Sequence, residues 1–433
     1  MRKSLRVAVI SHGHPDFSVG GAEVAAYNLF KGYRENPRVE EAVFLARCSR
    51  GPHPSGTITL RREGEYLWDQ AMHDWDCFRG LDRKEALRRF SDWLQSVRPD
   101  VVHAHHYAHM GLEIFRLIKR VCPDAKLFVT LHEYMAICKH NGQMVRPGGN
   151  RLCSSESIDD CHRCYPSISR ESFWLRKRFI MRHFDAVDGF FSPSEFLRQR
   201  YVDWGISPDR IVVIENGQEM REPVPHRPLT SGEYRNRFGF FGQLTQYKGV
   251  DVFLQGVEIA AKESETPIRV EIHGANLEGQ SQEFQERIGK LREKLERKRI
   301  LQWVGPYEPD ELPQRMANID WVVVPSIWWE NSPMVIQEAF HHRRPVICSG
   351  IGGMAEKVTP GRSGLHVEKG NIFEWAATIR RAAGDVLLWD SLEKEISPPA
   401  SYDEVADLHL ANFIGKNKVC SSLGKVFVSV GGD

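Results

Sequence analysis

Short apolar runs alternate along the chain with longer segments in which apolar residues recur at helical spacing. The short runs predict strands, and in the first half of the chain they cover residues 6–11, 42–46, 101–104, 126–131, 189–192 and 211–214. Strands that alternate with helical segments are typical of βα units and parallel sheets. The pattern therefore predicts an α/β class, with a Rossmann-like domain over residues 1–220. The charged, Trp-rich stretch between residues 43 and 101 is expected to be mostly helical.

A second series of the same kind follows a proline-rich linker, residues 221–232, which cannot hold a regular element. Its predicted strands cover residues 238–241, 269–273, 301–304, 321–325 and 345–348, and helices are expected at 280–299 and 402–413. We predict two doubly wound domains that face a cleft, the second over residues 233–400. Residues 401–433 are expected to form a C-terminal helix and tail that pack back across the domain junction.

The composition excludes several classes of protein. Of the 433 residues, 41% are hydrophobic and 27% are charged, which is ordinary for a globular protein. The 58 basic and 57 acidic residues nearly cancel, so the electrostatic signature of a nucleic-acid binder is absent. No apolar run approaches the ~18 residues that cross a bilayer. We expect a cytoplasmic protein with no nucleic-acid partner.

Residues 324–340 carry the richest candidate chemistry. A strand ends near residue 325, and Ser332-Pro333 is expected to open a helix, with Ser332 as the N-cap and Pro333 in the first turn. The amides that follow, those of Met334 and Val335, would then form an anion site at the positive end of the helix dipole.

Two acidic residues flank this expected anion site. Glu330 precedes it, and Glu338 lies about two turns into the helix. Carboxylates do not bind phosphate, but they accept hydrogen bonds from hydroxyls, which favours a sugar on one side and a ribose on the other. The alternative is an amphipathic helix with two solvated acids.

Two glycine-containing loops belong to the same half of the chain. Residues 242–249 include Gln243 and place Lys248 beside a glycine, as a diphosphate site would need. The turn from Gly350 to Ala355 also fits the dinucleotide pattern G-x-G-x-x-A, which leaves an NAD-dependent oxidoreductase as an alternative. Such an enzyme would normally carry that pattern in its first βα turn.

These motifs, taken together, resemble glycosyltransferase family 4, the retaining group with two Rossmann-like domains known as the GT-B fold. The marks are the E-x7-E pair Glu330 and Glu338, the G-[RQ]-L-x-x-x-K-G loop at 242–249, the G-G-x-x-E turn at 352–356, Gly20-Gly21 with Glu23, the pair His103 and His105, and His132 after a predicted strand. The resemblance spans residues 5–370. From the residues alone, His103 and His105 are interpreted as structural groups.

The resemblance implies a role for each motif. Glu338 would bind the ribose, Lys248 and the helix start at 332–335 the diphosphate, and Glu330 the sugar hydroxyls. His132 would lie beside the reacting carbon, and Gly20-Gly21 would let the backbone approach closely. Gln243 stands where the family commonly has Arg, so it can donate hydrogen bonds but no charge.

The activity implied by the resemblance is retaining transfer of a sugar from a nucleotide-diphosphate sugar to a glycan or lipid-linked acceptor, in cell-surface polysaccharide biosynthesis. No catalytic metal is expected. A non-catalytic nucleotide-sugar-binding scaffold remains an alternative. Asp74-Trp-Asp76 matches the metal-binding D-x-D of the other glycosyltransferase fold, but a solvated helix face is the favoured interpretation.

Four cysteines form a cluster within a short segment, Cys138-x14-Cys153-x7-Cys161-x2-Cys164. A hairpin between Cys138 and Cys153 would bring the first two together. Four thiolates suit a structural zinc ion, while an iron–sulfur cluster or metal-free cysteines remain open.

Residues 169–184 predict a basic amphipathic helix, with Phe173, Ile180 and Phe184 on one face. Two interpretations are open. The segment is either a core helix with a solvated basic side, or a peripheral contact with the inner face of the membrane.

Overall fold

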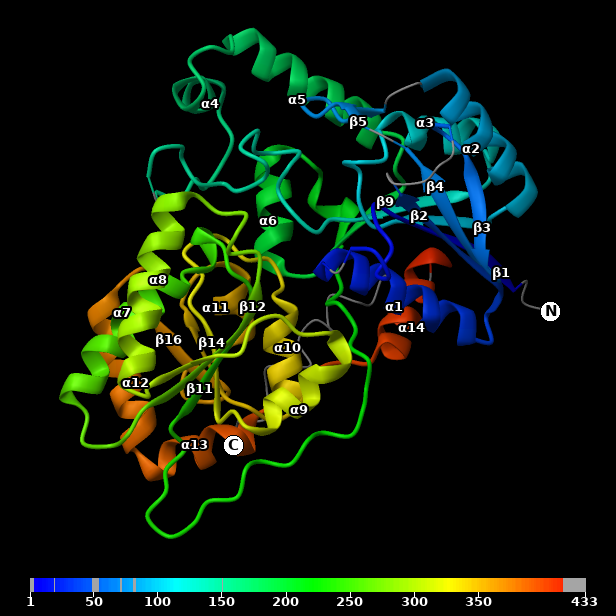
Figure 1. Ribbon diagram of the computed structural model, residues 1–433. Helices are drawn as coiled ribbons and strands as arrows, with labels where there is room; N and C mark the ends of the chain where they lie inside the picture. Colours follow the sequence, from blue (N-terminus) through cyan, green and yellow to red (C-terminus); the bar gives the residue numbers. More distant parts are fainter. Residues whose placement is uncertain are drawn as a thin grey trace, which may run out of the picture. The chain divides into compact units, whose positions relative to one another are not determined.

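The computed structural model describes residues 4–18, 20–48, 54–70, 72–80, 83–149 and 151–415. They divide into two compact units (Figure 1). The first unit comprises the residues up to Glu219 together with those from Ala400 onward, and the second comprises Met220–Pro399.

The first unit is built on an eight-stranded sheet with the order β10-β9-β8-β7-β1-β2-β4-β3. All neighbouring strands are parallel except β3 and β4. The strands are β1 Leu5–Ser11, β2 Val39–Cys48, β3 Ile58–Arg62, β4 Glu65–Asp69, β7 Val101–Ala104, β8 Lys126–Thr130, β9 Gly189–Ser192 and β10 Ile211–Val213. The six strands predicted in this half are confirmed.

Seven helices accompany this sheet in the described part of the first unit: α1 Gly21–Glu35, α2 Arg83–Val97, α3 Glu113–Val121, α4 Ile158–Cys164, α5 Arg170–Phe184, α6 Glu195–Trp204 and α14 Tyr402–Phe413. A short 3-10 helix, η1, spans Pro208–Arg210. Across both units, no described helix has the length and apolar character needed to cross a membrane.

Helix α14 returns the chain to the first unit, where it packs against α1 (Figure 1). Val405, Leu410 and Phe413 belong to the buried core of the first sheet. Gly32 permits the close approach, because a Cβ there would lie 2.9 Å from the carbonyl oxygen of Tyr402. The predicted bounds of this helix are confirmed.

The expectation that residues 43–101 are mostly helical is wrong. Before α2 the chain forms β3, β4 and the two-stranded pair β5 (Met72–Asp74) and β6 (Arg79–Gly80). Gly56 and Gly64 adopt positive φ angles of 88° and 75°, which turn the chain and prevent a continuous helix. The side chain of Asp74 accepts hydrogen bonds from the amides of Asp76 and Cys77, so it stabilises a local turn rather than lying on a helix face.

The second unit has a six-stranded, fully parallel sheet with the order β13-β12-β11-β14-β15-β16. The strands are β11 Arg237–Gln243, β12 Arg269–Ala275, β13 Leu301–Trp303, β14 Trp321–Val324, β15 Val346–Ser349 and β16 Gly364–Val367. The five predicted strands are confirmed. The sequence pattern missed β16 because its four residues include only two large apolar side chains.

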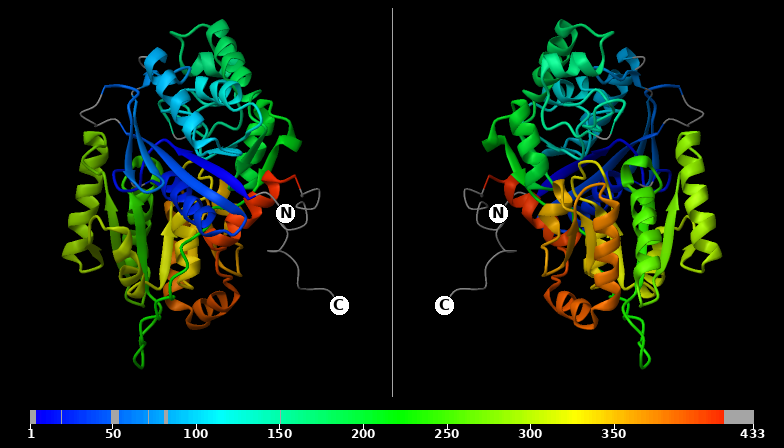
Figure 2. Two further views of the ribbon diagram at one scale, coloured as in Figure 1. Left: turned by 90° about the vertical axis from the view of Figure 1, so that its right-hand side faces the viewer. Right: turned by 90° about the vertical axis from the view of Figure 1, so that its left-hand side faces the viewer.

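Helices cover both faces of the second sheet (Figure 2). One face packs against α7 Val250–Glu263, α8 Gln282–Arg297, α12 Ile372–Gly384 and α13 Val386–Glu395. The other packs against α9 Leu312–Ala317, α10 Met334–His341 and α11 Gly352–Lys357. Two 3-10 turns, η2 Gln246–Lys248 and η3 Pro309–Glu311, complete the described elements.

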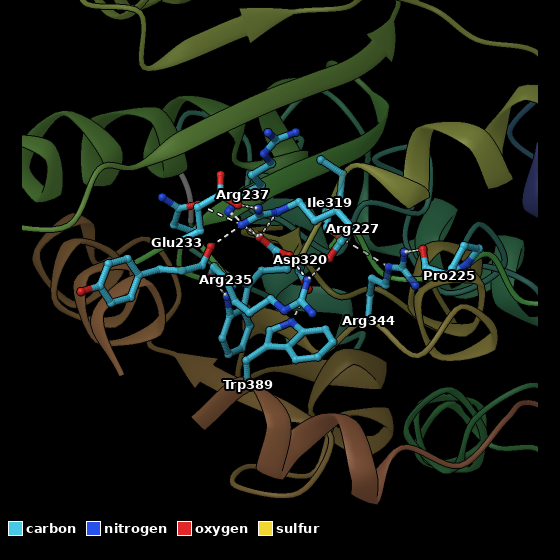
Figure 3. Close-up of polar contacts among 12 residues, drawn as sticks. Pro225, Arg227, Glu233, Arg235, Arg237, Ile319, Asp320, Arg344 and Trp389 are labelled. Carbon is cyan, nitrogen blue, oxygen red and sulfur yellow. Dashed lines mark hydrogen bonds and ion pairs between the residues drawn. The ribbon is translucent and has the colours of Figure 1, made fainter. Parts of the chain in front are cut away.

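A buried carboxylate, Asp320, anchors the proline-rich linker to the second unit (Figure 3). It lies directly before β14 and pairs with Arg227 at 2.9 Å and Arg235 at 3.2 Å. It also accepts the backbone N–H of Arg237, the first residue of β11. The linker has no regular structure, yet it is tied to the amino-terminal edge of the sheet.

Arg344 makes a second set of contacts with the linker (Figure 3). Its guanidinium is fully buried and donates to the carbonyl oxygens of Val224 and Pro225, and also to those of Met316 and Ile319. Burial lowers the pKa of Arg344 to about 10, so the group stays charged at neutral pH. The carbonyl dipoles take the place of the water that burial removes.

We predict that Asp320→Asn destabilises the protein by about 3–5 kcal/mol, because it leaves two nearly buried guanidinium groups without their counter-charge. Urea unfolding would measure the loss. Asp310→Asn is the matched control, because Asp310 pairs with Arg221 but is 84% exposed, so little change is expected. Equal stability of the two variants would contradict the anchoring role of Asp320.

Candidate functional site

Two separate sequence motifs of the second unit meet near the carboxyl ends of its central strands. The Nζ atom of Lys248 lies 2.7 Å from Oε1 of Glu330, although the two residues are 82 positions apart. Lys248 ends η2, just after β11, and Glu330 lies in the loop after β14. Because β11 and β14 are parallel neighbours, their following loops are brought to one edge of the sheet.

Glu330 is buried and its Oε1 accepts three hydrogen bonds. Besides Lys248, the donors are the Ser326 hydroxyl at 2.7 Å and the Trp328 indole N–H at 2.8 Å. Burial alone would raise the pKa of Glu330, but the charge of Lys248 and these hydrogen bonds hold it below its usual value. The side chain is therefore a carboxylate whose orientation is set by three donors.

Glycines allow the surrounding backbone to pack closely. Gly249 has φ 66°, and a Cβ there would collide with the carbonyl oxygen of Pro325. The amide of Gly353 donates a hydrogen bond to the carbonyl oxygen of Glu330 at 2.8 Å. A Cβ on Gly353 would collide with the carbonyl oxygen of Asn331. The glycine-rich turn predicted as a possible dinucleotide pattern thus supports the Glu330 loop.

Helix α10 begins beside this loop, one residue later than expected. Pro333 is the N-cap and Met334 is the first helical residue, so the prediction of Ser332 as N-cap is wrong. Pro333 has an extended conformation with φ −62° and ψ 115°, which is the backbone state of a residue that precedes a helix. The prediction that a helix begins after this loop is confirmed, and Val335 lies in its first turn.

Glu338 is half-buried in the middle of α10. Among the described residues, the structure shows no hydrogen bond to its carboxyl group. Burial raises the pKa of Glu338 to about 7. Burial, and then the charge of Glu338, raise the pKa of the Tyr307 hydroxyl. Gln243 ends β11 and is exposed.

The predicted residues of the first unit lie at the carboxyl ends of its strands. Gly20 is the N-cap of α1, and Gly21 is its first residue. The Glu23 carboxylate folds back against Gly20, where a Cβ would collide with it. Burial of Glu23 would raise its pKa, but the hydrogen bonds from His12 and Ser18 and the nearby His12 charge lower the pKa to about 2.

Histidines form a connected group after β7 and β8. Nδ1 of His105 lies 3.1 Å from Nε2 of His132. Burial, and then the charge of His12, lower the pKa of His132 to about 3, so it is neutral at pH 7. His103 is fully buried and contacts the hydroxyls of Tyr33 and Thr130, in keeping with a structural role.

Two family models together match most of the chain. One, described as a glycosyl transferase 4-like domain, matches residues 20–217, and the other, glycosyl transferases group 1, matches residues 235–385. The chain belongs to glycosyltransferase family 4.

Curated relatives of this glycosyltransferase align over nearly the whole chain. A D-inositol 3-phosphate glycosyltransferase of Corynebacterium jeikeium is 24% identical over 94% of this chain and 93% of its own length. The protein of the same name from Corynebacterium urealyticum is 28% identical over 88% of each chain.

Solved structures share the fold. A sucrose-phosphate synthase from Thermosynechococcus elongatus gives a TM-score of 0.65 at 14% identity, covering 95% of this chain and 98% of its own. HepE of Anabaena, solved in complex with UDP and glucose, gives 0.63 at 14% identity, covering 95% of this chain and 100% of its own. These matches confirm the predicted fold class of two α/β domains, the GT-B type.

The sequence did not indicate several residues that lie beside the predicted site residues of the glycosyltransferase's two units. Ser326 and Trp328 hold Glu330, and their only sequence signal was that they lie in the same loop. His12 contacts Glu23 and follows β1 directly, so its place after the first strand could have indicated it. Tyr307 lies far from Glu338 in sequence, and nothing in the local pattern indicates it.

The cysteine-rich segment of the glycosyltransferase forms the predicted hairpin. Val145 and Leu152 pair as an antiparallel bridge, and the amide of Cys153 donates to the carbonyl oxygen of Met144 at 2.7 Å. A small cavity of about 30 Å³ lies against the hairpin. Its lining includes all four clustered cysteines, Cys138, Cys153, Cys161 and Cys164.

The four thiols share a cavity but do not form a complete ligand set. None is in a disulfide. Over the described part of the chain, no three His, Cys, Asp or Glu side chains are arranged so that they could hold a metal ion. Burial raises the pKa of Cys161 to about 12, so its thiol is protonated in this arrangement. The zinc site therefore stays a prediction.

Metal analysis of the purified glycosyltransferase tests that prediction. If zinc draws the four thiolates together, we expect about one zinc per chain, and Cys161→Ser should lower both the zinc content and the melting temperature. Cys122→Ser is the control, because Cys122 lies outside the cluster. A metal-free protein from zinc-replete cells, with unchanged stability in Cys161→Ser, would exclude a structural zinc ion, and iron in its place would indicate a cluster.

Proposed function

We propose that the chain transfers a sugar, with retention of anomeric configuration, from a nucleotide-diphosphate sugar to a glycan or lipid-linked acceptor. The Lys248–Glu330 pair carries this proposal. It places a cation and an oriented carboxylate together at a strand edge where a helix also begins. A diphosphate needs a cation, and an oriented carboxylate can accept hydrogen bonds from sugar hydroxyls.

Each group of the second unit has a part in binding the donor. Lys248 and the positive end of α10, with Ser332, Pro333, Met334 and Val335, would neutralise the diphosphate. Gln243 would donate a hydrogen bond to it without adding charge. Lys248 and Glu330 are bound to each other in this structure, so the diphosphate would share the lysine with Oε1 of Glu330. The other oxygen, Oε2, would accept a hydroxyl of the sugar.

Glu338 suits the ribose. Its carboxyl group is half-buried and has no hydrogen bond from the described residues, and a carboxylate can accept both hydroxyls of a ribose ring. Burial makes the charged form costly in the free protein. Hydrogen bonds from the ribose would offset that cost.

His132 and Gly20-Gly21 of the first unit would act at the sugar. A neutral His132 can donate a hydrogen bond without placing a full charge beside the reacting carbon. Glycine at positions 20 and 21 would let the donor approach the backbone at the start of α1. The Glu23–His12 contact keeps this segment in place.

Catalysis would come mainly from stabilising the leaving diphosphate. Lys248 and the helix dipole would carry this charge stabilisation, so we propose no metal ion at the phosphates. An oxygen of the departing phosphate would take the acceptor's proton, and no side chain need serve as general base. A role in cell-surface polysaccharide assembly, at the cytoplasmic face of the membrane, fits a lipid-linked acceptor.

We predict that Lys248→Met weakens binding of UDP or GDP by about 10- to 150-fold, because it removes a charge-assisted contact with the diphosphate. Binding of the corresponding nucleoside should change little. Titration calorimetry with both ligands measures this difference, and thermal unfolding reports the cost of leaving Glu330 unpaired.

Lys262→Met, on the exposed side of α7, is the matched control and should bind as wild type does. Equal losses of nucleoside and diphosphate affinity in Lys248→Met would contradict a phosphate role for Lys248.

The Glu338 pKa predicts a pH dependence of nucleotide binding. Ribose hydroxyls donate to the ionised carboxylate, so affinity should fall by up to about tenfold per pH unit below pH 7, as the group takes up a proton in the free protein. Nucleosides are the suitable probe, because their binding involves no phosphate titration.

Glu338→Gln should bind the nucleoside about 10-fold or more weakly at pH 8 and should lose the pH slope between pH 6 and 8. Glu286→Gln, on the exposed side of α8, should keep both affinity and slope. A wild-type slope that persists in Glu338→Gln would assign the titration to another group and remove the ribose role.

A further inference from the structure

Helix α5 has two different faces. Phe173, Ile180 and Phe184 are buried in the first unit, as the helical spacing predicts. On the opposite side, Trp174 and Leu175 are 51% and 58% exposed. These two adjacent side chains form an exposed apolar patch on the helix.

The basic residues of α5 do not all serve the same purpose. Arg176 is buried and donates to the carbonyl oxygens of Asp76, Met135 and Ala136, so it is a structural residue. Arg176 therefore does not belong to the solvated or membrane-facing basic side that the sequence predicted. Lys177 is paired with Glu156 at 2.8 Å.

Arg178 and Arg182 are exposed on the same side as Trp174. The guanidinium of Arg178 lies 5.8 Å from the centre of the Trp174 ring. Arg116 of α3 reaches the same end of α5, where it donates to the carbonyl oxygen of Arg182. Among the described residues, the structure shows no carboxylate paired with any of these three arginines.

A groove of about 940 Å³ lies beside these side chains. It is lined by residues of the start of α4, of α5 and of the end of α6, among them Trp204. Its acidic lining consists of Glu156, which Lys177 neutralises, and Asp185 at the end of α5. Exposed apolar side chains, Trp174 and Leu175, therefore line the same groove as the positive charges of Arg178 and Arg182.

We propose that this surface, formed by Trp174, Leu175, Arg178, Arg182 and Arg116, binds the anionic headgroup layer of a lipid bilayer. Tryptophan partitions into the headgroup region, where its ring is apolar and its N–H remains hydrated. Arginines around it gain from negatively charged lipid. A polar protein partner would gain little from the exposed Trp174 and Leu175 pair, so the bilayer surface is the favoured occupant.

Vesicle sedimentation with the full chain at low salt tests the proposal. Wild type should sediment with vesicles of equal parts phosphatidylglycerol and phosphatidylcholine, but not with phosphatidylcholine alone, and high salt should release it. Arg178→Glu/Arg182→Glu should reduce the partitioning at least about 30-fold, from ~1 kcal/mol for each arginine. Trp174→Ser/Leu175→Ser should also reduce it.

Lys290→Glu/Arg297→Glu is the matched control, because it reverses two exposed charges on α8 of the second unit and should bind vesicles as wild type does. All variants should keep the wild-type melting temperature and nucleotide affinity, since none alters the core or the donor site. This separates a failure of the membrane proposal from a failure of the proposed reaction. Equal binding to both kinds of vesicle, no binding by wild type, or wild-type binding by Arg178→Glu/Arg182→Glu would overturn it.

Discussion

The candidate site of the second unit depends on the hydrogen bonds that the buried carboxylate of Glu330 accepts. A charge removed from water must be compensated, and here Lys248, Ser326 and Trp328 all direct donors to one oxygen. Together with the Gly353 amide, which binds the Glu330 carbonyl oxygen, these contacts join the loops after β11, β14 and β15. Three motifs that are separate in the sequence are thus held together by hydrogen bonds.

The short strand β14 connects the Glu330 loop to Asp320, the residue that anchors the linker. Asp320 precedes the strand and holds Arg227 and Arg235 at the amino-terminal edge of the sheet. Ser326 follows the strand and contacts Glu330 at the carboxyl edge. The four residues of β14 are fully buried, so the sheet core separates two charged clusters that have different roles. One positions the chain, and the other is the proposed donor site.

Burial changes the pKa values of the ionisable groups in the two units in different directions. Despite burial, the pKa values of Glu330 and Glu23 are lowered because Lys248 lies beside Glu330 and hydrogen bonds from His12 and Ser18 reach Glu23. For Glu338 and His132 burial is the larger effect, and it moves their pKa values toward the neutral form.

The sequence by itself determined the class of fold, because alternating apolar runs and helical periodicity depend only on local spacing. Eleven strands and α14 were predictable in this way. Lys248, Glu330 and Glu338 were singled out by motifs with fixed spacing, and their roles stay proposals. Only the tertiary structure decided that Lys248 binds Glu330, that Pro333 rather than Ser332 caps α10, and that Arg176 faces inward while Arg178 faces outward. These outcomes depend on which distant backbone atoms lie nearby, and a linear pattern carries no record of such contacts.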